Sequence, residues 1–297
     1  MLMLHPGSLG DFLLALPALQ GLRRRFPHDL IHWVAHPSLL RLFRQTPWYD
    51  SGTSIDSAAV AQLFSSSPPL DDLPFPPLDA AVCWLRDPEG QLSSNFRRLG
   101  ARQLVVQHPL SDPSKRHRSE LFWESLSPLG VFPGSPMRLV LSPKIQQKGE
   151  ELLRSWQIPP SMILHPGSGG EGKRWRPALY GELGDFLSQR GYPVVVLEGP
   201  AEPGWAGAVA GAMTRPVRVA SGLDLESAAG LLGVSLGFVG NDSGLTHLAA
   251  ALGIRTLALF KATDPLRWGP RGEQVRIETE PSRWGGAIRE LFDVPFC

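Results

Sequence analysis

The tetrapeptide HPGS occurs twice in this chain, at residues 5–8 and 165–168. Each copy follows a short apolar run and precedes a stretch whose apolar residues have helical spacing. The chain has 297 residues, more than the roughly 100 to 200 residues of one domain. A strand–turn–helix unit that recurs after about one domain length indicates two similar halves rather than a short-period repeat.

Strand and helix patterns alternate through both halves. Met1–Leu4 and the run from Leu30 read as strands, with a helix over Asp11–Phe26 between them. Further strands are expected at residues 80–85, 103–107, 162–164, 193–197, 237–239 and 255–260, and helices at 146–156, 177–190, 225–232, 243–252 and 284–292. Such alternation predicts parallel sheets with right-handed crossovers.

The expected fold class is α/β, with two Rossmann-like domains that face a central cleft. The boundary falls between Pro143 and Pro160, where a helical stretch leads into the second half. We therefore expect domains at residues 1–150 and 151–297.

Charge and cysteine content exclude several classes of protein. The net charge is +1, with acidic and basic residues mixed, so nucleic-acid binding is not expected. Two cysteines give neither a disulfide framework nor a metal-ligand cluster, and they fit a reduced cytoplasmic setting. The apolar amino terminus lacks the leading positive charges of a signal peptide, and no stretch approaches a membrane span. We expect a soluble protein, with contact at a membrane surface left open.

The HPGS turns stand where open parallel sheets bind anions, at strand carboxyl ends and helix amino termini. The alternative is that Gly7 and Gly167 only permit a tight turn. The second turn continues as GSGGEGKRW, in which four glycines allow close backbone approach and Lys173 offers a mobile charge to a phosphate. It matches neither a P-loop nor the G-x-G-x-x-G pattern. A solvated flexible loop is the alternative for this segment.

The stretch FVGNDSGLTHLAAALG is the most distinctive feature of the chain. A strand is expected to end at Val239, and the residues through Asp242 and Ser243 supply turn and N-cap chemistry. His247 falls one helical turn after Ser243. Capping explains Ser243, but it does not explain the whole run together with His247.

Three stretches together resemble glycosyltransferase family 9, the ADP-heptose:lipopolysaccharide heptosyltransferases: SLGDFLLALPAL, HPGSGGEGKRW, and GNDSGLTHLAAALG through TDPLRWGP. The resemblance implies the GT-B fold, with an acceptor-binding first domain and a nucleotide-sugar-binding second domain. It also implies inverting transfer of a heptose from an ADP-sugar to a lipid-linked or lipopolysaccharide core acceptor, without metal or other cofactor. Such an enzyme works in the cytoplasm, with peripheral contact at the inner membrane left open.

The family pattern assigns roles residue by residue. Asp11 is similar to the general base and Lys173 to the diphosphate-binding lysine. Ser168 matches a position near the phosphates. Glu202, with Glu198 as competitor, matches the acid that holds the ribose hydroxyls, and Leu223 could pack on the adenine. The remaining nucleotide-sugar positions implied by the resemblance are Asp242, Ser243, Gly244 and His247.

Physical chemistry is compatible with the two catalytic assignments. Inverting transfer needs a base for the acceptor hydroxyl, and Lys173 with the helix start at Ser243 can stabilise charge on a departing diphosphate without a metal. The structural alternative for Asp11 is an N-cap of the following helix. Three alternative functions stay open: transfer of another sugar or to another acceptor, nucleotide-sugar epimerisation on a GT-B fold, and non-catalytic nucleotide-sugar binding.

Overall fold

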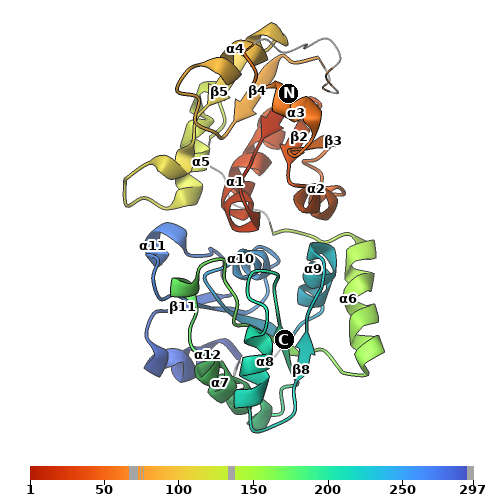
Figure 1. Cartoon of the computed structure of the whole chain (residues 1–297), viewed down its shortest axis with the longest axis vertical. Coiled ribbons are helices and arrows are strands. Elements are labelled where there is room, and N and C mark those ends of the chain that lie inside the picture. Colours follow the sequence, from red (N-terminus) through yellow and green to blue (C-terminus); the bar gives the residue numbers. More distant parts are fainter. Residues whose placement is uncertain (67–72, 74, 76, 133–137, 293–297) are drawn as a thin grey trace. The chain divides into compact units, whose positions relative to one another are not determined.

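A computed structural model describes residues 1–66, 73, 75, 77–132 and 138–292. The contacts divide the chain into two compact units, residues 1–137 and 138–297, each built around a parallel sheet (Figure 1). No helix in the described ranges is both long and apolar enough to cross a bilayer.

The first unit contains a five-stranded sheet in the order β3-β2-β1-β4-β5, in which all pairs are parallel. Its strands are β1 (Leu2–Leu4), β2 (His32–Ala35), β3 (Ser51–Ser54), β4 (Ala80–Cys83) and β5 (Gln103–Val106). Its α-helices are α1 (Leu9–Arg25), α2 (Pro37–Phe43), α3 (Ala58–Gln62), α4 (Gln91–Arg98) and α5 (Arg118–Ser125).

The second unit contains a six-stranded parallel sheet in the order β11-β10-β9-β6-β7-β8. Its strands are β6 (Met162–His165), β7 (Val194–Leu197), β8 (Arg218–Ala220), β9 (Gly237–Asn241), β10 (Thr256–Leu259) and β11 (Val275–Glu278). Its α-helices are α6 (Pro143–Trp156), α7 (Pro177–Gln189), α8 (Trp205–Ala212), α9 (Leu225–Gly233), α10 (Gly244–Ala251), α11 (Pro265–Trp268) and α12 (Trp284–Phe292).

The two sheets share one topology, and the repeated tetrapeptide occupies the same place in both. Counted from the first strand of each unit, the order is 3-2-1-4-5 in the first and 3-2-1-4-5-6 in the second. Both are doubly wound orders: strands 2 and 3 are added on one side of strand 1, and strand 4 and those after it are added on the other side. The switch point lies between strands 1 and 4. Each HPGS turn follows strand 1, so it lies at the switch point where such sheets bind ligands.

Central strands are apolar throughout because helices cover both faces of a doubly wound sheet. The sequences LML in β1, AAVC in β4 and VVVL in β7 are buried at every position. In the second unit, α7, α8 and α12 share one core with the strands. These runs explain why the central strands were predictable from sequence.

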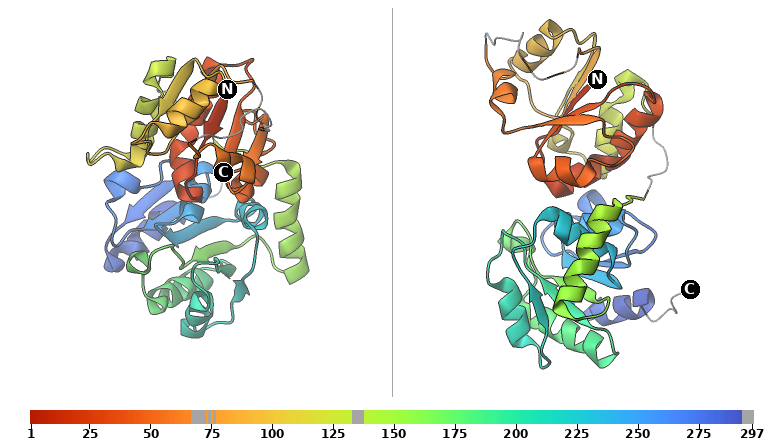
Figure 2. Two further views of the ribbon diagram at one scale, coloured as in Figure 1. Left: turned by 45° about the horizontal axis from the view of Figure 1, so that its top comes forward. Right: turned by 90° about the vertical axis from the view of Figure 1, so that its right-hand side faces the viewer.

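The contact boundary lies before α6, earlier than the boundary expected at residues 150–151. Helix α6 packs closely on α9 (Figure 2), and a Cβ at Gly149 would lie 2.1 Å from the carbonyl oxygen of Gly230. The amide of Leu139 donates to the carbonyl of Ala251 at 2.8 Å. Residues 138–156 are thus held by the second unit.

Most expected elements are confirmed within one to three residues, and two positions are corrected. Helix α1 begins at Leu9 rather than Asp11, with Ser8 as its N-cap. Strand β9 continues to Asn241 rather than ending at Val239. Strands β3, β8 and β11 were not predicted; β3 and β11 are partly exposed and lack an apolar run, and β8 has only three residues.

Candidate functional site

The first HPGS turn is closed by a buried histidine. The amide of Gly7 donates to Nδ1 of His5 at 3.1 Å, and the His5 ring packs against Phe12, Trp84 and Phe122. Burial lowers the pKa of His5 to about 4, so the ring is neutral at pH 7. A neutral acceptor in this apolar pocket holds the turn and is not available as an acid at neutral pH.

Asp11 belongs to the capping box of α1. Its Oδ2 accepts hydrogen bonds from the amide and the hydroxyl of Ser8, at 3.1 and 2.9 Å. Ser8 is the N-cap and Asp11 the third helical residue, so the alternative role of Asp11 as the N-cap itself is wrong. Among the described residues, Oδ1 of Asp11 has no hydrogen-bond partner, which leaves one carboxylate oxygen able to accept a proton.

Gly7 and Gly167 are required by space rather than by backbone angles. Neither has a positive φ. A Cβ at Gly7 would lie 2.7 Å from the Cβ of Asp11, and one at Gly167 would lie 1.8 Å from Oε1 of Glu202. The two glycines therefore do permit a tight turn, and they do so through close approach of side chains to the backbone rather than through a positive φ.

The second turn encloses a buried carboxylate. Glu202 is 3% exposed, and its Oε1 accepts from the amide of Gly199 at 2.8 Å and lies 3.8 Å from Nε2 of His165. Nδ1 of His165 is 3.0 Å from the carbonyl oxygen of Leu197 and donates to it. Burial lowers the pKa of His165. The Glu202 carboxylate thus lies directly beneath the glycine turn.

Glu198 follows β7 and Leu223 follows β8, the two neighbouring strands of the same sheet. Oε2 of Glu198 accepts from the amides of Gly204 and Ala206, at 2.8 and 3.1 Å, at the start of α8. Leu223 is half-buried in the loop between β8 and α9. Both glutamates therefore have backbone partners, and Glu198 is the more exposed of the two.

Two side chains join the turn after β6 to the end of β9. The buried hydroxyl of Ser168 donates to the carbonyl of Asp242 at 2.7 Å. Asn241, which is fully buried, donates to the carbonyl of Pro166 at 2.6 Å and accepts from the amide of Trp175 at 3.3 Å. These hydrogen bonds fix the loops after β6 and β9 to each other, and the Ser168 hydroxyl donates one of them.

Lys173 meets Asp242 at the centre of the site. Nζ of Lys173 lies 2.8 Å from Oδ2 of Asp242, and the lysine side chain remains 37% exposed while the aspartate is 7% exposed. The hydroxyl of Thr263 donates to the same Oδ2 at 2.6 Å. Asp242 therefore fixes a lysine from the second turn and a threonine from the loop after β10, and part of the lysine stays accessible to a ligand.

Arg174 adds a buried positive charge. Its guanidinium donates to the carbonyl of Ser168 at 3.0 and 2.8 Å and to that of Ala201 at 3.1 Å, and it lies over the Trp205 ring at 5.2 Å. No carboxylate among the described residues pairs with it. Carbonyl dipoles only partly offset a full charge, so Arg174 contributes a positive field that opposes the negative charges of Asp242 and Glu202.

The amino terminus of α10 completes the group. Ser243 is its N-cap and accepts from the amide of Thr246 at 3.4 Å. Gly244 is the first helical residue, which leaves backbone amides at the helix start for an anion. His247 is buried one turn later. The expected N-cap role of Ser243 is confirmed, and His247 lies beside it.

The site residues expected from sequence thus fall in two groups. Asp11 belongs to the first unit, whereas the nucleotide-sugar candidates lie around the switch point of the second. Sequence reasoning did not single out Thr263, Arg174 or Asn241; Thr263 and Arg174 stand inside the TDP and GKRW stretches that were noted. Among the described residues no group of three or more His, Cys, Asp or Glu side chains is arranged to hold a metal ion. This arrangement can bind a polyanion at the second switch point.

Comparison with known proteins gives a consistent result. The family model for glycosyltransferase family 9 (heptosyltransferase) matches residues 126–285, more than half of the chain. A protein of Escherichia coli named lipopolysaccharide heptosyltransferase 3 is 24% identical over 314 residues, which cover 95% of this chain and 88% of that protein.

Solved structures share the fold over nearly the full length. The glycosyl transferase family 9 protein from Veillonella parvula DSM 2008 matches with a TM-score of 0.80 at 19% identity, over 100% of this chain and 89% of that one. The E. coli heptosyltransferase WaaC with ADP matches with a TM-score of 0.71 at 19% identity, over 97% and 98%. The expected GT-B class, with two Rossmann-like domains, is confirmed.

Proposed function

Because the chain belongs to glycosyltransferase family 9 and is therefore a glycosyltransferase, we propose that it transfers a heptose from an ADP-sugar to a lipopolysaccharide core precursor, with inversion and without a metal. A role in lipopolysaccharide biosynthesis follows from the heptosyltransferase family and from its relatives. The donor, the acceptor and the stereochemistry are the parts we propose.

One observation carries the proposal: the lysine and helix start at the second switch point. Lys173, placed by Asp242, lies in the same site as the free amides of α10. The leaving diphosphate gains negative charge as the glycosidic bond breaks, and fixed positive groups stabilise that charge best when they need no rearrangement. The buried guanidinium of Arg174 adds to the same field. These charges take the part that a divalent metal plays in other transferases.

The nucleotide part of the donor rests on the relatives. Two structures of E. coli WaaC contain ADP or ADP-2-deoxy-2-fluoro heptose. We propose that Leu223 packs on the adenine and that Glu202 or Glu198 accepts from the ribose hydroxyls. Glu198 needs only to release helix amides at the surface, whereas Glu202 must leave its buried position beneath Gly167.

We assign Asp11 the role of general base. Its Oδ2 is fixed by Ser8 while Oδ1 is open to a donor, an arrangement that orients the carboxylate without consuming it. When the acceptor hydroxyl attacks the anomeric carbon, its proton passes to Oδ1 and the sugar–phosphate bond breaks. The anomeric carbon is attacked from the face opposite the diphosphate, so its configuration inverts. We further propose a cytoplasmic enzyme that meets its acceptor at the inner membrane.

The proposal is tested by donor- and acceptor-dependent release of nucleotide. The protein is incubated with a heptose-free lipopolysaccharide core precursor and with ADP-heptose, a UDP-hexose or a GDP-hexose, and the product is identified by mass. We expect a heptose-sized mass increase with ADP-heptose alone, its loss in Lys173→Met, and its retention in the exposed control Lys144→Met. Acceptor-dependent release of UDP or GDP, without release of ADP, would show that an ADP-sugar is not the donor.

A further inference from the structure

The Arg174 side chain connects two loops of the second unit. Its Nε and Nη2 donate to the carbonyl of Ser168, in the loop after β6, and Nη2 also donates to the carbonyl of Ala201, in the loop after β7. The Trp205 ring, at the start of α8, lies 5.2 Å from the guanidinium. The arginine is 7% exposed, so these charge-assisted hydrogen bonds lie in a water-poor setting, where they are strongest.

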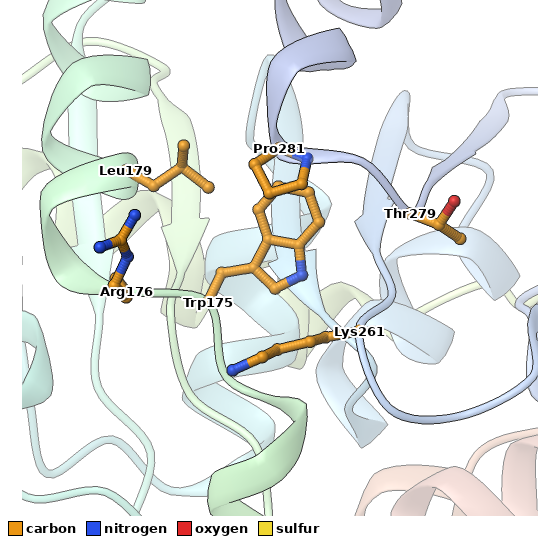
Figure 3. Close-up of a pocket in the computed structure, with 6 residues that line it drawn as sticks. All are labelled: Trp175, Arg176, Leu179, Lys261, Thr279 and Pro281. Atoms are coloured by element: carbon orange, nitrogen blue, oxygen red, sulfur yellow. The ribbon is translucent and has the colours of Figure 1, made fainter.

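The backbone from which this side chain extends is itself fixed. The next residue, Trp175, is 3% exposed and belongs to the core of the second unit, and its amide donates to Oδ1 of Asn241 at 3.3 Å. Figure 3 shows the Trp175 ring in the pocket that Leu179 also lines, with the Lys261 side chain directed toward the chain before the ring. Lys261 donates to the carbonyl of Arg174 at 3.4 Å. The guanidinium therefore starts from a fixed point.

The two connected loops carry different parts of the proposed nucleotide site. The loop after β6 carries Lys173, and the loop after β7 carries Glu198 and Glu202. Both glutamates accept from amides of their own segment, and those contacts are lost when a carboxylate turns toward a ribose. The bond from Arg174 goes to the main chain at Ala201, so it persists when the glutamate side chains rotate.

We propose that Arg174 is a positioning residue for the nucleotide. It holds the loop after β7 at the distance from the Lys173 loop that lets one nucleoside diphosphate meet the lysine through its phosphates and a glutamate through its ribose. This inference rests on the proposed function, and it adds to the electrostatic role of Arg174 a geometric one. Lysine cannot fill the geometric role, because a single ammonium lacks the planar fork that reaches two carbonyls and lies over a ring.

The variant Arg174→Lys separates the two roles, because it keeps the charge and loses the fork. ADP spans both loops, whereas pyrophosphate occupies only the diphosphate half, and the affinity of each is measured by calorimetry. We expect Arg174→Lys to bind ADP about tenfold more weakly and pyrophosphate within about twofold of the wild type. Arg176→Lys is the matched control, at an exposed arginine two residues further along, and should leave both affinities unchanged.

A second variant carries the test if Arg174→Lys does not fold. Trp205→Leu removes the ring beside the guanidinium, and it should weaken ADP about threefold with pyrophosphate unchanged.

The inference is overturned if folded Arg174→Lys binds ADP as tightly as the wild type, which would leave Arg174 its charge alone. An equal loss for ADP and pyrophosphate would also overturn it, because the effect would then lie in the diphosphate half. A wild-type protein that binds ADP no better than pyrophosphate would refute the proposed donor, and this inference with it.

Discussion

The buried His5 makes a sharp prediction about the acid stability of the first unit. Burial lowers its pKa from 6.5 to about 4, so the unfolded chain binds a proton between these values and the folded unit does not. The contribution of neutral His5 to the free energy of unfolding is therefore complete above about pH 6.5 and is lost as the pH falls toward 4. With 1.36 kcal/mol for each pKa unit, His5 alone lowers the free energy of unfolding by about 2 kcal/mol between pH 7 and pH 5.

The variant His5→Gln isolates this contribution, because glutamine can accept from the Gly7 amide but does not titrate. Amide hydrogen exchange in β1 and α1 reports on the first unit alone and is measured at pH 7 and pH 5. We expect the free energy of opening to fall by about 2 kcal/mol less in His5→Gln than in the wild type. His28→Gln, at an exposed histidine, should behave as the wild type. Equal pH dependence in His5→Gln and the wild type would refute a buried neutral histidine at this turn.

Three further predictions concern the second unit. Gly167→Ala forces a methyl group onto Glu202 and should destabilise the protein by about 1–3 kcal/mol in urea unfolding, whereas Gly169→Ala, whose Cβ meets nothing within 4 Å, should cost far less. Thr263→Val removes one donor to Asp242 and should weaken ADP-sugar binding about fivefold by calorimetry, the equivalent of about 1 kcal/mol; unchanged affinity would exclude Thr263 from the site. Transfer activity should survive EDTA, and a loss restored by magnesium would contradict the metal-independent mechanism.

The sequence predicts the central strands and switch points well, because burial on both faces leaves continuous apolar runs such as VVVL in β7. The edge strand β3, with sequence SGTS, cannot be identified in this way because its residues are at least partly exposed. Asn241 is likewise typical of a turn, yet it is the last residue of β9. Its side chain donates to the carbonyl of Pro166 and accepts from the amide of Trp175, contacts that the sequence alone does not reveal.

The candidate site was predictable where a role is local in sequence. Ser243 as N-cap follows from its place before an apolar helix. The pairing of Asp242 with Lys173 and Thr263 joins loops after three different strands, so it depends on strand order and cannot be read from any one motif. The burial of Glu202 is similar, because it arises from the approach of the turn at Gly167.

The transfer rate of Asp11→Asn tests the central claim most directly. Asparagine keeps the size of the side chain and an acceptor for the Ser8 amide, but it cannot take a proton. At saturating ADP-heptose and acceptor, we expect the rate to fall roughly 10²- to 10⁴-fold, with donor affinity within about twofold of the wild type and Asp29→Asn fully active. A folded Asp11→Asn protein that transfers heptose at the wild-type rate would contradict the assignment of Asp11 as the base.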